Sequence, residues 1–235
     1  MKMSSVMKVK KRMRRNRIYR LTFIASGILS LIFVLITFYG QNAGNFIMTV
    51  DHDAYKRGIV LSKEESFRDP QARLMTRAID EAIDMNYTWL KVEEVKLASG
   101  NYIDPDFDYL AFTFHIKNNG SETVDVGYHI RITEVYKEMD HAIRILVIED
   151  DVETIYKKPE RFDSGTPVAD HLSGIKPINF LNETIVTRKR IQSFKPGDTR
   201  KFSVIIWIEG TDPDTTDEIL GGLVKMQMMF SIETD

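Results

Sequence analysis

The sequence predicts a mainly β protein, in which an N-terminal transmembrane helix precedes one antiparallel β-sandwich of Ig-like or jelly-roll-like type with a single short helix. Two observations lead to this fold class. Leu21–Tyr39 has no charged residue, and its nineteen residues would form a helix about 28 Å long, close to the ~30 Å hydrocarbon core of a bilayer. After residue 44, short segments with apolar residues at alternate positions are separated by turn residues, which is typical of antiparallel sheets.

The charges around Leu21–Tyr39 predict a single-pass protein of the cell membrane with a cytoplasmic N-terminus. Nine Lys and Arg residues occur in residues 1–20, whereas no acidic residue precedes Asp51. A basic flank stays on the cytoplasmic side, so residues 1–20 would be a cytoplasmic tail facing anionic lipid headgroups, and the C-terminal domain would be extracytoplasmic. Beside a membrane span, this tail does not indicate binding to nucleic acid.

An alternative interpretation of Leu21–Tyr39 is the apolar region of a cleaved signal peptide. Such regions are usually about 7–15 residues long, which is shorter than this segment. The best cleavage point follows Ala43, but Gln41 stands where a small residue is preferred. We therefore expect an uncleaved signal-anchor helix.

Residues 44–235 predict one extracytoplasmic β-sandwich domain, long enough to bury a core of its own. The chain has no cysteine, which excludes disulfides, thiolate zinc sites and thiol nucleophiles. No HExxH, GxSxG, Walker or GxGxxG motif is present. The turn Asp163-Ser164-Gly165 has the Asp-Ser-Gly pattern of aspartic proteases, but that chemistry needs two carboxylates and the chain has one copy. We expect no catalysis and no resident cofactor.

The first part of this domain changes its apolar period along the chain. Asn45–Asp51 and Gly58–Ser62 predict two strands. In Pro70–Met85, apolar residues recur every three to five positions, which predicts the short helix. Tyr87–Leu97 returns to a period of two and predicts another strand.

The remaining apolar segments predict three hairpins and a final strand. Asn118–Glu122, the turn of the first hairpin, contains Gly120, which suits a positive φ. Asp150-Asp151 and Pro196-Gly197 are the turns of the other two. The predicted pairs are Tyr109–Lys117 with Val124–Thr133, Ala142–Glu149 with Val152–Lys157, and Ile185–Ser193 with Thr199–Glu209, and Val224–Ile232 closes the domain.

Two acidic segments and one long loop are the candidate sites. Carboxylates in loops of extracellular modules bind calcium at about 10⁻⁴–10⁻³ M, so both acidic segments are weak calcium candidates. In the second segment, Thr215-x-x-Glu218 followed by Gly221 favours helix capping over calcium. Pro159–Asn179 is a candidate contact surface, since long irregular loops are often functional. The calcium candidates are Asp104, Asp106, Asp108, Asp212, Asp214 and Asp217, and the interaction candidates are Asp163, Gly165, Pro167 and His171.

The block FKPGDTRKFSVIIWIEGTDPDTTDEILGGLVKMQMMFSI, Phe194–Ile232, carries a family resemblance. With the N-terminal anchor and GNFIMTVD, it resembles a poorly characterised group of single-span surface proteins of Gram-positive-type bacteria. It is more distantly similar to the TasA/camelysin-like secreted β-sandwich proteins, which implies a surface β-sandwich and, for an untethered subunit, fibre formation. The closer group often has a cysteine where this chain has Thr215 or Thr216, so the resemblance implies no essential thiol here. The metallopeptidase label of one distant relative does not transfer, because no zinc-ligand motif matches.

These observations predict a membrane-anchored cell-surface β-sandwich with a structural or protein-interaction role. Its partners would be the lipid bilayer, through Leu21–Tyr39, and a surface protein or a second copy of the chain, contacted by sheet edges or the long loop. One alternative is a calcium-dependent adhesion or matrix subunit. Another is an extracellular hydrolase, which requires carboxylates of the two acidic segments to converge in a cleft.

Overall fold

The computed structural model describes residues 19–34, 45–161 and 173–233. The chain divides into two compact units, Met1–Ala43 and Gly44–Asp235. In the first unit, residues 19–34 form an α-helix with exposed side chains. None of the described helices is long and apolar enough to cross a membrane, and residues 35–39 of the predicted span lie outside the described residues, as does most of the basic tail. The transmembrane helix stays a prediction.

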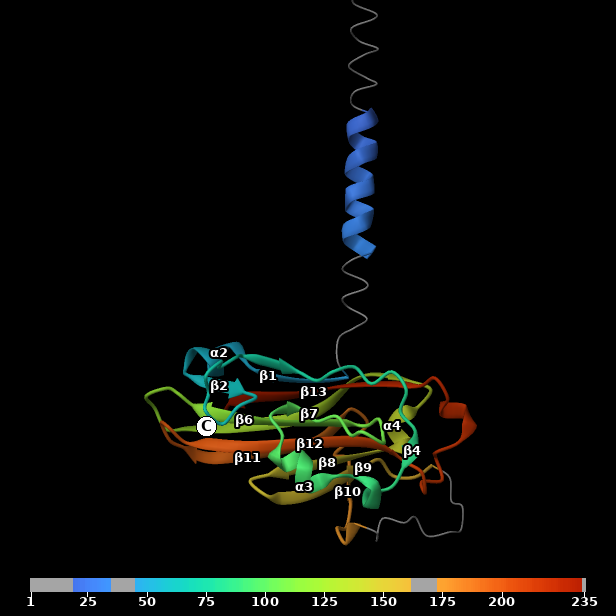
Figure 1. Cartoon of the computed structure of the whole chain (residues 1–235). Helices are drawn as coiled ribbons and strands as arrows, with labels where there is room; N and C mark the ends of the chain where they lie inside the picture. Colours follow the sequence, from blue (N-terminus) through green and yellow to red (C-terminus); the bar gives the residue numbers. More distant parts are fainter. Residues whose placement is uncertain (1–18, 35–44, 162–172, 234–235) are drawn as a thin grey trace, which may run out of the picture. The chain divides into compact units, whose positions relative to one another are not determined.

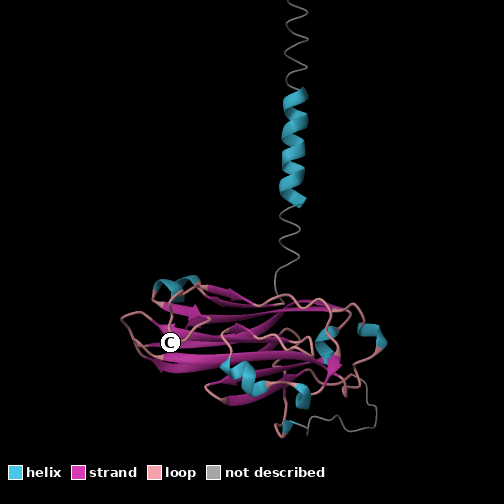
Figure 2. Cartoon of the chain, in the orientation of Figure 1, coloured by secondary structure: helices cyan, strands magenta, loops and turns pink. Residues whose placement is uncertain are grey.

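The second unit consists of two β-sheets packed as a sandwich, joined by short helices and loops (Figures 1 and 2). Its strands are β1 (Phe46–Val50), β2 (Ile59–Ser62), β3 (Arg73–Met75), β4 (Asp84–Met85), β5 (Gly100–Asn101), β6 (Leu110–Asn118), β7 (Val124–Tyr136), β8 (Ile143–Glu149), β9 (Val152–Lys157), β10 (Ile178–Asn179), β11 (Ile185–Phe194), β12 (Thr199–Glu209) and β13 (Leu223–Ile232). Its helices are α2 (His52–Lys56), α3 (Val92–Leu97), α4 (Met139–Ala142) and the 3₁₀ turns η1 (Tyr87–Trp89) and η3 (Asp217–Ile219).

Both sheets are mixed, which corrects the prediction of a purely antiparallel sandwich. The five-stranded sheet has the order β11-β7-β13-β1-β3. The eight-stranded sheet has the order β10-β9-β8-β12-β6-β2, with β4 beside β12 and β5 beside β6. β1 runs parallel to β13, β10 to β9 and β4 to β12, while the other pairs are antiparallel. The mainly β class is confirmed.

The main core lies between the two sheets and is rich in aromatic rings. Phe114 of β6 stacks on Phe202 of β12 with centroids 5.4 Å apart, and Tyr128 of β7 meets Phe202 edge-on at 5.3 Å. A second cluster covers the outer face of the eight-stranded sheet, where Trp207 of β12 and Val95 of α3 are buried. The buried residues of both clusters lie between Phe46 and Phe230, so this unit contains its own core and we expect it to fold alone.

The helix predicted over Pro70–Met85 is wrong, because this segment has no helical residue and contains the strands β3 and β4 joined by irregular backbone. Leu74 pairs with Met48 of β1, and the hydroxyl of Thr76 accepts the N–H of Phe46 at 3.2 Å. Pairing with β1 therefore replaces the internal hydrogen bonds of a helix. Helical propensity is a weak preference that tertiary contacts of this kind override.

The strand predicted over Tyr87–Leu97 is also wrong, since this segment forms η1 and α3. The side chain of Asn86 accepts the N–H of Thr88 at 3.1 Å and begins the 3₁₀ turn. Val92 and Val95 are three positions apart and both buried, as one face of a helix requires. The buried valines therefore have the spacing of a helix, and the alternation of apolar residues along this segment does not reflect a strand.

Two of the three predicted hairpins have the right strands but the wrong pairing. β6 belongs to the eight-stranded sheet and β7 to the five-stranded one, and β12 and β11 divide in the same way. The turn between β6 and β7 and the turn between β11 and β12 therefore cross from one sheet to the other. The buried side chain of Asn118 connects the two turns, because it donates to the carbonyls of Glu122 and Phe194, both at 2.8 Å. The hairpin of β8 and β9 is confirmed, and Asp150 and Asp151 have the positive φ that a tight two-residue turn needs.

Candidate functional site

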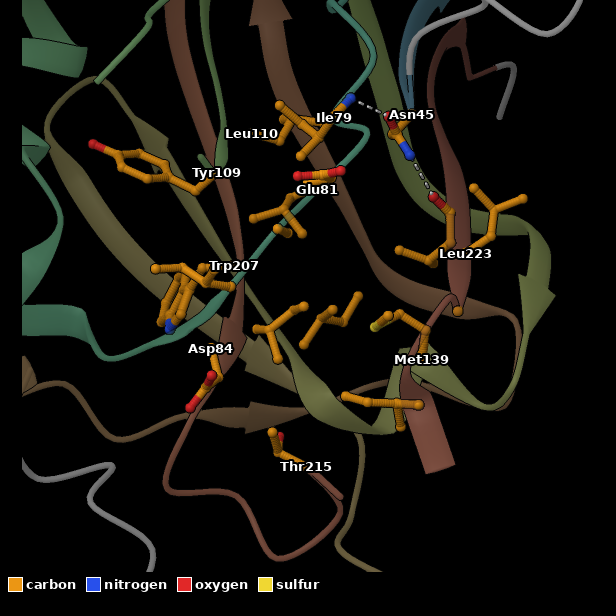
Figure 3. A pocket seen from close by; sticks show the side chains of 18 of the residues that line it. Asn45, Ile79, Glu81, Asp84, Tyr109, Leu110, Met139, Trp207, Thr215 and Leu223 are labelled. Atoms are coloured by element: carbon orange, nitrogen blue, oxygen red, sulfur yellow. Dashed lines mark hydrogen bonds between the residues drawn. The ribbon is translucent and has the colours of Figure 1, made fainter. Parts of the chain in front are cut away.

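A pocket of about 630 Å³ opens at one end of the sandwich (Figure 3). The first residues of β6, β8 and β13 and the last residues of β12 reach it, together with residues 79–84 and the loop that holds η3. Pockets for small ligands and peptide side chains usually have about 300–1,000 Å³, so its size is in the range of a binding site.

The interior of this pocket is apolar. Figure 3 shows Tyr109 and Trp207 on one side and Met139 and Leu223 on the other. Besides Tyr109 and Trp207, the buried apolar residues that line it are Leu110, Met139, Ile143, Ile206, Ile208, Ile219 and Met226. An occupant would gain chiefly from removing apolar surface from water.

Asn45, just before β1, fixes two walls of the pocket relative to each other. Its side-chain oxygen accepts the N–H of Ile79 at 2.9 Å, and its side-chain nitrogen donates to the carbonyl of Val224 at 3.3 Å (Figure 3). One side chain thus connects residues 79–84 with the start of β13. This cross-link gives the pocket a preformed entrance.

The mouth of the pocket carries acidic and exposed apolar side chains. No Lys, Arg or His is among the described residues that line it, whereas Asp80, Glu81, Asp84 and Asp217 are. These four carboxylates are exposed and form no ion pair with a described basic residue. Leu220, 66% exposed, adds an apolar lip. The entrance therefore combines a negative charge with apolar surface.

Beside the pocket, a buried ion pair holds the loop that follows β12. Arg144 of β8 and Asp212 are both fully buried, and the guanidinium Nη1 lies 2.6 Å from the carboxylate Oδ2. The other oxygen of Asp212 accepts the N–H of Asp214 at 2.8 Å. Asp214 accepts the backbone N–H of Arg161 at 2.9 Å, and His141 Nδ1 lies 3.8 Å from it. These contacts join the loop to β8, α4 and the residues after β9.

Lys158 makes a second buried charge contact near α4. Its ammonium lies 2.6 Å from Asp140 and donates to Glu183 at 2.8 Å. Burial lowers the pKa of Lys158, but the hydrogen bonds to the two carboxylates outweigh it, so the pKa is raised overall. The hydrogen bond from Lys158 lowers the pKa of Glu183.

The first acidic segment is a hydrogen-bonded turn. Asp104 is buried, and its Oδ1 accepts the N–H groups of Asp106 and Phe107 at 2.9 and 3.2 Å. Its Oδ2 accepts the hydroxyl of Tyr109 at 3.1 Å. Asp108 forms an ion pair of 2.6 Å with Arg77. Structural partners thus occupy these carboxylates.

The two acidic segments lie at the same end of the eight-stranded sheet, because Leu110 at the start of β6 pairs with Ile206 near the end of β12. They do not gather into a metal centre: within the described ranges, no three His, Asp or Glu residues form a group able to hold an ion. The cap of η3 is Thr216, one residue beyond the predicted Thr215, whose hydroxyl donates to Glu209 O instead.

The predicted interaction residues Asp163, Gly165, Pro167 and His171 lie outside the described residues. Sequence reasoning missed the pocket instead, because its walls come from segments far apart in the chain. The three acids in residues 79–84 gave no signal, because acids between apolar residues are also the pattern of an amphipathic surface helix.

No family model and no curated protein matches this chain. Two crystal structures of a β-glucosidase from Kluyveromyces marxianus, one in complex with glucose, align with 80% and 75% of the chain at 13% identity, with TM-scores of 0.28 and 0.27. The chain spans only 18% and 16% of their length. ACE19, the collagen binding subdomain of the Enterococcus faecalis surface protein ACE, aligns with 56% of this chain and 92% of its own, at 10% identity and a TM-score of 0.21. The assignment as a two-sheet β-sandwich rests on the strand pairing of this chain itself.

Proposed function

We propose that residues 44–235 form a non-catalytic binding module of the cell surface, and that the pocket at the end of the sandwich is its binding site. The observation that carries this proposal is the pocket itself: an apolar interior of about 630 Å³ with a fixed entrance. A well-formed apolar pocket with a few polar groups at its mouth is the usual place where a folded domain binds a ligand or a partner side chain.

Anchoring at the membrane is part of this proposal and rests on the sequence. Leu21–Tyr39 would span the bilayer, with residues 1–20 in the cytoplasm and the β-sandwich outside. The hydrolase alternative is less favoured, because Asp104 caps a turn and Asp212 pairs with Arg144. Carboxylates in such structural contacts are poorly placed to act as an acid and base pair.

Photo-crosslinking on intact cells tests the proposed binding site. A photoreactive phenylalanine analogue placed at Leu220, on the lip of the pocket, should give a crosslinked product of higher mass. The same analogue at Val152 is the matched control, since Val152 is equally exposed at 66% but follows the β8–β9 turn at the opposite end of the sheet.

The product should disappear when Ala82→Trp, on the pocket lining, obstructs the entrance. Equal products at the two positions, or none at Leu220, would refute the pocket as the binding site. Cleavage of the β-sandwich by protease added to intact cells checks the predicted orientation, because a cytoplasmic domain would be protected.

A further inference from the structure

The charge of the pocket mouth bears on what the pocket accepts. Asp80, Glu81 and Asp84 lie on the wall that residues 79–84 form, and Asp217 lies on the loop that holds η3. Of the nearby basic groups, Arg77 pairs with Asp108 at 2.6 Å, whereas Lys137 donates to the carbonyl of Leu220 at the lip and keeps its charge there. Four carboxylates beside this one lysine give the mouth a net negative charge, which attracts a cation and repels an anion.

The backbone at the same mouth is open for pairing. Residues 80–82 belong to no strand, with a bend at Asp80, and their N–H groups make no hydrogen bond to described residues. The carbonyl groups of a peptide backbone can accept hydrogen bonds from such N–H groups. A small amine would leave them to water.

From these observations we propose that the occupant is an extended segment of a partner protein in which Lys or Arg flanks large apolar side chains. The apolar side chains enter the pocket between Met139 and Trp207, the cations meet Glu81 and its acidic neighbours, and peptide carbonyls accept hydrogen bonds from the N–H groups of residues 80–82. This inference rests on the proposed function and specifies its ligand.

Fluorescence anisotropy with purified residues 44–235 tests the inference. The probes are the labelled peptides Lys-Phe-Leu-Phe-Lys and Glu-Phe-Leu-Phe-Glu, which have the same apolar centre and opposite charge. We expect the lysine peptide to bind at least about tenfold more tightly, and its affinity to fall as salt is raised. Ala82→Trp should abolish its binding.

Matched variants separate local charge from net charge. Asp80→Asn with Glu81→Gln should weaken binding of the lysine peptide about five- to tenfold. Asp53→Asn with Asp151→Asn removes the same charge from exposed positions at the other end of the sandwich and should leave the affinity within about twofold.

The contrary outcomes are distinct. Equal binding of the two peptides would overturn the charge assignment and leave the pocket as a binding site. Displacement of the lysine peptide by phenethylammonium at comparable concentrations would indicate that the occupant is a small amine and contradict the peptide. Absence of peptide binding, or binding that Ala82→Trp does not affect, would refute the inference, whereas the crosslink at Leu220 judges the proposed function independently.

Discussion

Two loops of this domain contain the same tripeptide, Asp-Pro-Asp, and fold into the same turn. Asp104 accepts the N–H of Asp106 at 2.9 Å, and Asp212 accepts the N–H of Asp214 at 2.8 Å. An aspartate side chain bonds readily to the backbone two residues ahead, which makes this turn a local property of the sequence. Up to this point the two loops are alike.

They differ in what meets the second carboxylate oxygen. Asp104 accepts the neutral hydroxyl of Tyr109, whereas Asp212 lies against the guanidinium of Arg144 in a fully buried pair. The local sequence therefore determines the turn, and the neighbouring strand determines whether it buries a charge. Because an unpaired buried charge is far more costly than a lost neutral hydrogen bond, the two aspartates should differ in their effect on stability.

The largest effect is expected from breaking the buried pair. Arg144→Met should lower the free energy of unfolding by about 3–5 kcal/mol, because the Asp212 carboxylate is left buried without its cation. Asp212→Asn should also be destabilising, because it removes a carboxylate from the buried guanidinium. Urea unfolding of residues 44–235 followed by circular dichroism measures this loss. The double variant should lose much less than the sum, since neither side chain of the pair is then charged and an asparagine oxygen still accepts the N–H of Asp214. Additive losses in this cycle would contradict the pairing.

A smaller effect is expected in the first loop. Asp104→Asn should cost about 0.5–1.5 kcal/mol, because the amide oxygen still accepts the N–H groups of Asp106 and Phe107 and only the bond to the Tyr109 hydroxyl is altered. The same urea experiment compares it with Asp212→Asn. A loss in Asp104→Asn as large as in Asp212→Asn would show that the first loop also depends on charge.

Much of the fold could be predicted from the sequence where burial alternates along a strand. The inward faces of β6, β7, β12 and β13 follow the predicted alternation, and the two-residue turn of Asp150 and Asp151 gave the one correct hairpin. The wrong predictions concern which strands pair with each other. Alternation tells which face of a strand is buried, but not which strand lies beside it, so a crossover tied by Asn118 has the same pattern as a hairpin.

The candidate site was less accessible to sequence reasoning. Its acids lie in residues 79–84, a segment whose conformation is set by Asn45 and β12 and not by its own periodicity. The six aspartates that were conspicuous in the sequence mostly stabilise turns or pair with arginine. Acidic clusters are visible in a sequence, whereas their partners, such as Arg144, come from distant strands.

The two loops should also differ in their influence on tyrosine ionisation. Burial raises the pKa of Tyr109, and the adjacent Asp104 carboxylate raises it further. A folded pKa above the unfolded value of about 10 gives stability that is present below pH 10 and lost as pH rises through the folded pKa. Asp104→Asn should lower the pKa of Tyr109 and so reduce this alkaline loss. Ultraviolet titration of tyrosinate measures the shift, with Asp217→Asn as the control that should leave the titration unchanged.

The smallest effect is expected from calcium, for which both loops were candidates. Asp104 and Asp212 use both oxygens on protein partners, Asp108 pairs with Arg77, and Asp214 is enclosed by its own contacts. A site with a Kd of about 10⁻³ M would add about 1.4 kcal/mol of stability in 10 mM calcium, enough to raise the melting temperature by about 3–6 °C. We expect a change below about 1 °C, because a calcium ion would have to displace these partners. A rise of several degrees that Asp106→Asn removes would instead assign calcium to the first loop, and the difference between the loops would then extend from charge burial to metal binding.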